Sequence, residues 1–319
     1  MTSTIAPSTV IQPRANDRLE HARDEPVVHR VTLHGVTAEV VAPRSLNRTI
    51  NIVLRGYPIS GTDRSPDIRI TVEQNEGARA RWLVSDGSHT YPEMDKKGMP
   101  AIRAEWLLIS QAIKLWPDFV HVHAGLIATQ HASALLIGKS GSGKSTTTVA
   151  LSLNGLDVYT DDVALIDRTS LQALCVPRPI KLDRQSRAML RERGLEIPPH
   201  KRLNESIDRT ILPGLPPIEE PGPRLASVLF FASNRADKPS LRPISGAEAI
   251  LRLVQQSASE RFDLQGASPG ALAIVNSVPC YELISADLDS TVELIQCHLK
   301  HAPDSGRPHI VSEEARSRP

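Results

Sequence analysis

Apolar and polar residues alternate along the first hundred residues of the chain. The alternation runs through residues 31–40, with a break at His34-Gly35, and returns at residues 68–72. A period of two is typical of half-buried β-strands. Residues 51–56 and 81–84 are also apolar and of strand length, and a cluster of Gly, Pro and charged residues follows at 92–100. The pattern predicts a small β-rich N-terminal module over residues 27–100.

From Ile102 the period changes to that of a helix, with an apolar stripe that runs from Trp106 to Trp116 and ends at Pro117. Beyond it, short apolar segments alternate with helical ones. The expected strands are residues 119–122, 132–137, 156–159, 226–231 and 281–284, and the expected helices are residues 144–153, 247–256 and a last one through residues 292–299. This alternation predicts an α/β domain over residues 101–300.

Three stretches lack any such period. Residues 1–26 and 301–319 are polar and charged, which predicts disordered tails. Residues 204–224 are rich in Pro and acidic residues, which predicts an excursion on the surface. No apolar run reaches the ~18 residues of a membrane span, and the N-terminus lacks the apolar centre of a signal peptide. We therefore expect a cytoplasmic protein without a membrane partner.

Charge and cysteine content narrow the picture further. The 37 Lys and Arg nearly cancel the 36 Asp and Glu, for a net charge of +1, so no overall field attracts nucleic acid and we expect no such partner. The three cysteines, Cys175, Cys280 and Cys297, show no C-x-x-C spacing. An odd number without that spacing favours reduced thiols.

A glycine-rich segment between the strand at 132–137 and the helix at 144–153 has the pattern of a phosphate-binding P-loop. Glycines let the backbone wrap around phosphates, and the helix that follows presents free N–H groups and the positive end of its dipole. Lys144 would reach the β- and γ-phosphates, and the Ser145 hydroxyl would ligate Mg²⁺. The sequence thus predicts ATP and Mg²⁺ as cofactors. The expected nucleotide-binding residues are Gly138, Lys139, Ser140, Gly141, Ser142, Gly143, Lys144, Ser145 and Thr146.

Two adjacent carboxylates, Asp161 and Asp162, follow the next expected strand. A right-handed β-α-β crossover leaves the carboxyl ends of both strands at one edge of the sheet, so the pair is expected beside the phosphates. One carboxylate can hold Mg²⁺ while the other accepts a proton from an attacking hydroxyl. The alternative is a pair that only ends a strand or caps a turn.

Two further groups lie near this pattern. His121 and His123 alternate on one expected strand, so their side chains share a face; they could form a metal-binding pair, pack as buried histidines, or place His123 near the phosphates. Arg178 and Lys181 follow the Asp pair by about one strand and a turn. Either could neutralise the transferred phosphoryl group, or lie at the surface or at the edge of the nucleotide.

Together these segments resemble the C-terminal catalytic domain of the HPr kinase/phosphorylase family. The resemblance rests on residues 123–127, 135–145 and 155–163, which follow in the order His-(Ala)-Gly, P-loop and Asp-Asp. It implies a nucleotide-binding core of the HPr kinase / PEP carboxykinase type and a homo-oligomer. It also implies catalytic roles for His123 and Asp161, with Asp161 activating the target serine, and a metal site at Ser145 and Asp162. Lys144 joins the catalytic residues through its place in the P-loop.

The chain departs from that family at two places. Thr146 stands where the family usually has Glu, and the family's second signature is replaced by residues 176–182. This segment resembles that of HPr-kinase-related proteins, including kinases of lasso-peptide precursors. The resemblance therefore implies an ATP- and Mg-dependent serine kinase acting on a peptide or protein. Two alternatives stay open: a nucleotide-dependent ATPase switch or scaffold without a phosphoryl acceptor, and a small-molecule kinase.

Overall fold

The computed structural model describes residues 25–61, 64–75, 82–93, 98–180, 182–196, 200–204, 207–210, 220–256 and 264–302. The predicted tails, apart from their inner two residues, lie outside the described residues, as do residues 205–206 and 211–219 of the predicted excursion. Within the described part, strands and helices mix in the manner of an α/β protein, so the predicted fold class is confirmed at that level.

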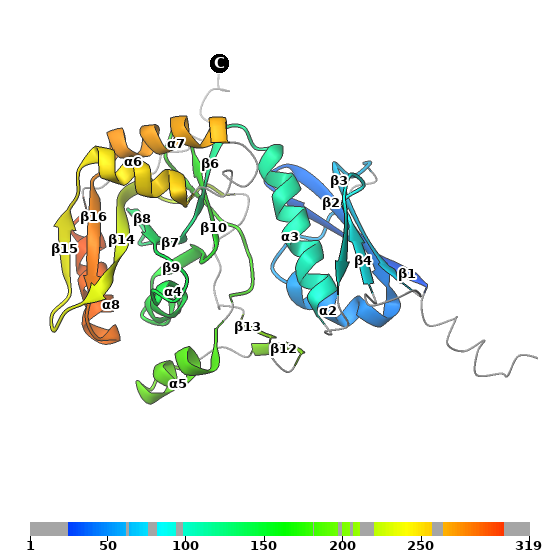
Figure 1. The fold of residues 1–319 in the computed structure, drawn as a ribbon, viewed down its shortest axis with the longest axis horizontal. Coiled ribbons are helices and arrows are strands. Elements are labelled where there is room, and N and C mark those ends of the chain that lie inside the picture. The colour runs from blue at the N-terminus through cyan, green and yellow to red at the C-terminus, as the bar shows by residue number, and fades with distance from the viewer. Residues whose placement is uncertain are drawn as a thin grey trace, which may run out of the picture.

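The N-terminal part contains a five-stranded sheet in the order β1-β2-β3-β4-β5 (Figure 1). Its first two strands form a hairpin, and β2 runs parallel to β3. His34 and Gly35 make the turn with φ of 45° and 78°, as two-residue hairpins of this hand require. The predicted strands at 31–40, 68–72 and 81–84 are thereby confirmed. The bounds are β1 Pro26–Leu33, β2 Val36–Pro43, β3 Ile68–Gln74, β4 Trp82–Ser85 and β5 Thr90–Glu93.

The strand predicted at residues 51–56 is wrong. A short turn, η1 (Arg44–Leu46), leads into a helix, α2 (Asn47–Val53). Leu46, Ile50, Val53 and Tyr57 are all buried, and their spacing of three or four residues is that of a helix face. The prediction failed because it used an apolar window that began at residue 51 and missed this longer period.

The helix predicted from Ile102 exists as α3 (Met99–Lys114). Its apolar face packs on the five-stranded sheet: Ala104, Leu107 and Leu108 share one buried cluster with Ile70 and Val84. The sequence pattern grouped this helix with the P-loop domain, but its packing belongs to the N-terminal part. We therefore call the five-stranded sheet with α2 and α3 the N-terminal module.

The C-terminal part is built on a six-stranded sheet in the order β15-β16-β14-β8-β7-β9. Strands β8, β14 and β16 are mutually parallel, whereas β7 is antiparallel to both β8 and β9. Strands β8 and β9 thus point the same way, as predicted, but β7 lies between them. The bounds are β7 Gly125–Ala128, β8 Ser133–Ile137, β9 Asp157–Thr160, β14 Leu225–Arg235, β15 Ser240–Pro243 and β16 Cys280–Ser285.

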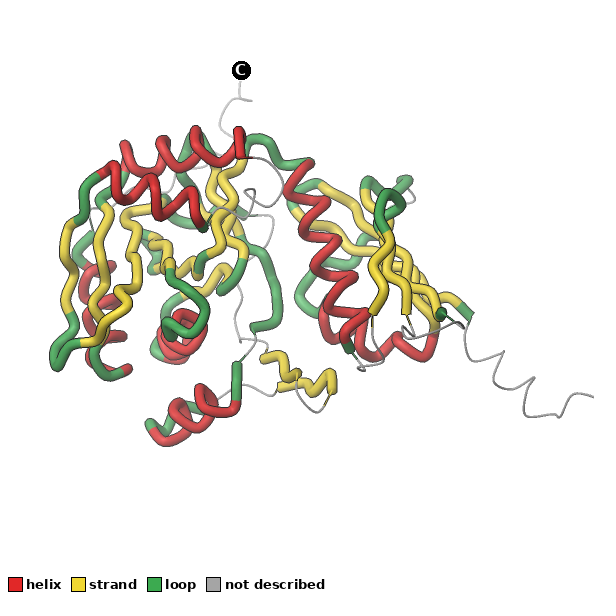
Figure 2. The backbone as a smooth tube through the Cα atoms, in the orientation of Figure 1, coloured by secondary structure: helices red, strands yellow, loops and turns green. Residues whose placement is uncertain are grey.

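Helices cover both faces of this sheet, which gives three layers (Figure 2). Ala249 and Ile274, from α6 and α7, pack with Leu135 on one face. Leu151 and Ile295, from α4 and α8, pack on the other. The predicted helices at 144–153 and 247–256 and the last helix are confirmed. The bounds are α4 Lys144–Leu153, α5 Arg184–Glu192, α6 Gly246–Gln255, α7 Leu264–Ser277 and α8 Leu288–Lys300.

A small sheet of β6 (Phe119–His123), β10 (Val163–Asp167) and β11 (Ala173–Leu174) joins the two parts. Its Leu165 belongs to the buried cluster of the N-terminal module, while Ala164 belongs to the cluster beneath α6 and α7. Because neighbouring residues of a strand face opposite ways, each part packs on one face of this sheet. The sheet carries His123 on β6 and begins β10 directly after Asp162.

Two smaller elements occupy the remaining segments. Strands β12 (His200–Asn204) and β13 (Ile207–Thr210) pair as an antiparallel hairpin, so the predicted irregular excursion contains a strand where only loop was expected.

Among the described residues, every helix is too short or too polar to cross a lipid bilayer.

Candidate active site

The glycine-rich loop, residues 138–143, leaves β8 and enters α4 directly. Gly141 and Gly143 have φ of 84° and 92°, a left-handed backbone that other residues rarely adopt. A Cβ added at Gly138 would lie 2.5 Å from Ser142 Oγ and 3.0 Å from Phe231 Cβ. Both the curvature of the loop and its close approach to β14 therefore require glycine.

The first turn of α4 adds donors to this loop. Gly143 stands at the N-cap and provides no side-chain cap, so the first N–H groups of the helix have no partner within it. Lys144 opens the helix with only 8% of its surface exposed. Burial lowers the pKa of its ammonium, while Asp162 and Asp161 act to raise it. A partly desolvated cation and free N–H groups together form an anion-binding surface.

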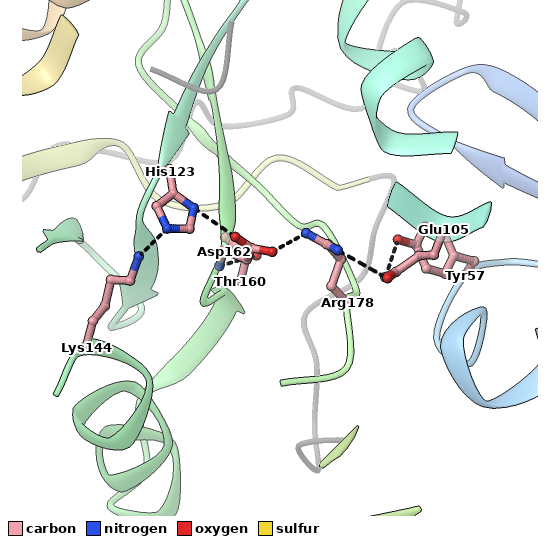
Figure 3. Close-up of polar contacts among 7 residues, drawn as sticks. All are labelled: Tyr57, Glu105, His123, Lys144, Thr160, Asp162 and Arg178. Carbon is pink, nitrogen blue, oxygen red and sulfur yellow. Dashed lines mark hydrogen bonds and ion pairs between the residues drawn. The ribbon is translucent and has the colours of Figure 1, made fainter. Parts of the chain in front are cut away.

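His123 connects Lys144 to Asp162 (Figure 3). The Lys144 ammonium lies 3.2 Å from His123 Nε2, and His123 Nδ1 lies 2.8 Å from Asp162 Oδ1. An ammonium can only donate, so Nε2 accepts, and Nδ1–H then donates to the carboxylate. The two contacts thus define the tautomer of His123 when it is neutral.

The two adjacent carboxylates experience opposite environments. Burial, with a smaller contribution from the charge of Asp162, raises the pKa of Asp161 to about 6, although the Ser145 hydroxyl bonds to it. Burial alone would also raise the pKa of Asp162, but Arg178 and His123 hold it well below its ordinary value. Asp161 can therefore take up a proton near neutral pH, whereas Asp162 stays ionised.

Arg178 is buried within this network, so the predicted alternative that it lies at the surface is wrong. Its side chain is 8% exposed and pairs with both Asp162 and Glu105. Glu105 comes from α3 of the N-terminal module and also bonds to Tyr57 (Figure 3). Sequence reasoning missed Glu105 because a single acidic residue in an amphipathic helix is ordinarily solvent-exposed, and nothing in the pattern indicates its burial.

A cavity of about 490 Å³ opens on the other side of the glycine-rich loop, towards β14 and β16. Arg235, at the end of β14, lines this cavity and a smaller one that reaches the start of α4. Among the described residues, no carboxylate pairs with Arg235. The sequence holds one hint of it, the change from apolar to polar residues at 232–235. The larger cavity is lined mainly by residues 137–142, 230–233, Arg235, Arg252, Gln255, Gln256, Glu282 and Ser285.

The remaining predicted residues separate into two groups. Ser145 lies with the carboxylates, although its hydroxyl contacts Asp161 rather than Asp162, and Lys139 and Ser140 are exposed on the loop. Thr146, in contrast, is turned away and donates to Ser186 Oγ of α5 at 2.7 Å. Lys181 lies outside the described residues.

His121 and His123 lie in different surroundings. His121 is buried and stacks on Trp116, with ring centroids 6.5 Å apart, and burial lowers its pKa to about 4. In the part of the chain that the structure describes, no three His, Cys, Asp or Glu residues gather as a metal cluster. Of the predicted alternatives, packing as a buried histidine applies to His121, and a position near the glycine-rich loop applies to His123.

The donors at the loop fit Mg²⁺ better than a metal held by protein alone. Ser145, Asp161 and Asp162 provide hard oxygen atoms, and Mg²⁺ is commonly held by one or two carboxylates together with phosphate oxygens and water.

A scan against protein-family models and a search of curated proteins both find no match to this chain.

Proposed function

We propose that the protein is an ATP- and Mg-dependent kinase that transfers the γ-phosphoryl group to a hydroxyl, that of a serine in a peptide or protein. One observation carries the proposal: Lys144, at the start of α4, is joined through His123 to Asp162, and the adjacent Asp161 has a pKa shifted in the opposite direction. Phosphoryl transfer requires such a set of groups: donors for the phosphates, an ionised carboxylate that can hold Mg²⁺, and a proton acceptor. In this proposal the loop is a P-loop, and the core is of the HPr kinase type.

The glycine-rich loop and the start of α4 would hold the phosphates with backbone N–H groups, and Lys144 would neutralise charge as the γ-phosphoryl group moves. Bound Mg²⁺ would supply further neutralisation of the phosphate oxygens, with Ser145 and Asp162 as its protein ligands. Asp162 is suited to that role because Arg178 keeps it ionised. His123 would keep Lys144 and Asp162 in place before the nucleotide binds.

Asp161 would accept the proton of the serine hydroxyl as its oxygen forms a bond to the γ-phosphorus. The bond from that phosphorus to the β-γ bridging oxygen breaks, and ADP leaves with the bond electrons. A carboxyl group whose pKa is raised to about 6 can hold this proton transiently and release it near neutral pH. The role of base therefore suits Asp161 better than Asp162.

The lining of the 490 Å³ cavity does not include Asp161 or Asp162, so the cavity would take the ribose and base while the γ-phosphate faces Asp161. Its polar lining from Gln255, Gln256 and Ser233 could bond to these groups. The nucleotide would then lie along the loop from β14 towards β9. This orientation leaves the acceptor to approach from the side of His123.

Incubation of the full chain with γ-labelled ATP, Mg²⁺ and a set of serine peptides tests the proposal. We expect label on peptide serine, with ADP formed in equal amount. Slow hydrolysis with every peptide and protein, together with ATP-dependent complex formation, would favour the switch or scaffold instead. Label on a free amino acid or sugar alone would favour a small-molecule kinase. A chain that neither binds Mg-ATP nor is stabilised by it in a melting assay would contradict all three.

Arg235→Gln is expected to weaken ATP binding selectively. Arg235 lines both cavities beside the loop, and a charge-assisted hydrogen bond to phosphate contributes about 1.5–3 kcal/mol, or roughly 10- to 100-fold in affinity. The KM for ATP should rise by that factor while the KM for the peptide changes little. Arg69→Gln, which removes an exposed arginine on the N-terminal sheet, is the control. An unchanged KM for ATP would rule out a phosphate contact by Arg235.

A further inference from the structure

A continuous series of polar contacts runs from the N-terminal module into the active site (Figure 3). The Tyr57 hydroxyl lies 3.4 Å from Glu105 Oε1. Glu105 pairs with Arg178, which in turn pairs with Asp162. The series continues from Asp162 through His123 to Lys144. A residue of α3 thus reaches the phosphate-binding lysine through three intervening side chains.

Arg178 uses all three of its nitrogen atoms in this arrangement. Nε lies 3.0 Å from Glu105 Oε1 and Nη2 lies 3.1 Å from Oε2, which is the paired geometry that a guanidinium forms with a carboxylate. Nη1 is left to contact Asp162. Because two parallel bonds prevent rotation of the planar group, Glu105 determines where Nη1 points.

Burial makes this arrangement rigid. Glu105 is 2% exposed and the side chain of Arg178 is 8% exposed, so water cannot replace either partner. Asp162 is more open, with 37% of its side chain exposed, as a group that meets a ligand must be. The buried pair therefore acts as a fixed support for a partly exposed carboxylate.

A purely structural pair would need no third partner. Buried ion pairs add little net stability compared with apolar residues of similar size, and the interface between α3 and the small sheet already has apolar contacts through Leu165 and Val176. The specific feature of this pair is that Nη1 of Arg178, the nitrogen that does not contact Glu105, contacts Asp162 beside the loop. The arrangement is thus explained by what it does to Asp162.

We propose that Glu105 is a positioning residue for phosphoryl transfer, which holds Arg178 so that Arg178 fixes the orientation of Asp162. The proposal rests on the kinase function proposed above. It makes the N-terminal module part of the active site, since a shift of α3 would move the guanidinium away from Asp162. Displacements on the order of 1 Å can lower rates by about 100-fold.

The test is a cycle of Glu105→Gln, Arg178→Gln and the double variant in the full chain, with kcat, the KM for ATP and the Mg²⁺ concentration at half-maximal rate as readouts. We expect Glu105→Gln to lower kcat by about 10- to 100-fold and to raise the Mg²⁺ requirement, with the KM for ATP within about twofold. Because Glu105 acts through Arg178, the double variant should be no slower than Arg178→Gln.

Glu93→Gln is the matched control. Glu93, at the end of β5, is 6% exposed and pairs at 2.6 Å with Arg103 of α3, the helix that carries Glu105. It does not contact Arg178. It should lower the melting temperature as Glu105→Gln does, without changing the Mg²⁺ requirement. Equal kcat and Mg²⁺ dependence in the two variants would overturn the proposal, as would effects of Glu105→Gln and Arg178→Gln that multiply in the double variant.

If Glu105→Gln does not fold, Glu105→Asp decides, because it keeps the negative charge but withdraws the carboxylate from Arg178 by one methylene group. A lower kcat at an unchanged melting temperature supports positioning through Glu105, and an unchanged kcat overturns it. Loss of the kinase function itself is recognised separately. In that case the unaltered chain transfers no phosphoryl group to any acceptor, whereas failure of the positioning proposal leaves the unaltered chain active.

Discussion

Asp161→Asn is expected to remove phosphoryl transfer while the protein stays folded and still binds ATP. The amide keeps the shape of the carboxyl group but cannot accept the serine proton, and general bases contribute on the order of 10²- to 10⁴-fold to such reactions. We expect kcat to fall on the order of 10³-fold, with little change in the KM for ATP. Single-turnover transfer from γ-labelled ATP, measured beside ATP binding by calorimetry, checks both parts.

The same variant should be at least as stable as the unaltered protein above pH 6. Burial raises the pKa of Asp161 from its ordinary value of 3.8 to about 6. The folded state therefore holds the proton more tightly than the unfolded chain, and the ionised carboxylate disfavours folding above pH 6. A rise of this size corresponds to on the order of 3 kcal/mol. This penalty is relieved as the pH falls from 6 towards 3.8, and Asn removes it at every pH.

Asp157→Asn is the control for this pair of measurements, because Asp157 begins β9, the strand that Asp161 follows, but is exposed. It should change neither the rate nor the melting temperature at pH 8. Transfer that survives in Asp161→Asn would show that Asp161 is not the base. A melting temperature at pH 8 well below that of the unaltered protein would contradict the assigned burial of an ionised carboxylate.

Lys144→Met is expected to have the second large effect, on both nucleotide binding and transfer. Met matches the length of the side chain but has no charge to place on the phosphates, and loss of one such donor lowers kcat by about 10²- to 10³-fold. ATP affinity should fall by about 100-fold as well, because the charge acts on the bound nucleotide and on the transition state. Calorimetric titration with Mg-ATP and the labelled-transfer assay measure the two effects.

Lys139→Met provides the comparison within the same loop. Lys139 is exposed, whereas Lys144 is 8% exposed and bonded to His123. We expect Lys139→Met to bind ATP within about threefold of the unaltered chain, as loss of a solvated charge has a small effect. Equal losses in the two variants would mean that the loop attracts nucleotide by overall charge and that Lys144 makes no specific contact.

Local pattern was sufficient for much of the fold. Periodicity and glycine position predict the break at His34-Gly35, the strand before the glycine-rich loop and the helix from Lys144 to Leu153, because these features depend on residues close in sequence. Short segments were harder. The apolar run at residues 51–56 predicts a strand where α2 (Asn47–Val53) forms, and the pattern gives no helix at residues 264–277, where α7 contains Pro269.

Part of the candidate site also followed from order along the chain. Asp161 and Asp162 are expected beside Lys144 because strands that point the same way end at one edge of a sheet, whereas the place of His123 follows from the resemblance. The structure does bring these residues together. Thr146 was included by its place beside Ser145, but successive residues of a helix point about 100° apart. Its hydroxyl therefore faces α5.

The amino-acid sequence by itself determined the glycine-rich loop, the helix that follows it and the residues that can act on a phosphate, since these depend on local backbone geometry and side-chain chemistry. The tertiary structure alone decided that α3 belongs to the N-terminal module, that Arg235 lines the cavities beside the loop, and that Glu105 holds Arg178 against Asp162. The last contact joins residues 73 positions apart. No local period encodes such a pair, because it forms only when burial of two separate apolar surfaces brings their few charged groups together.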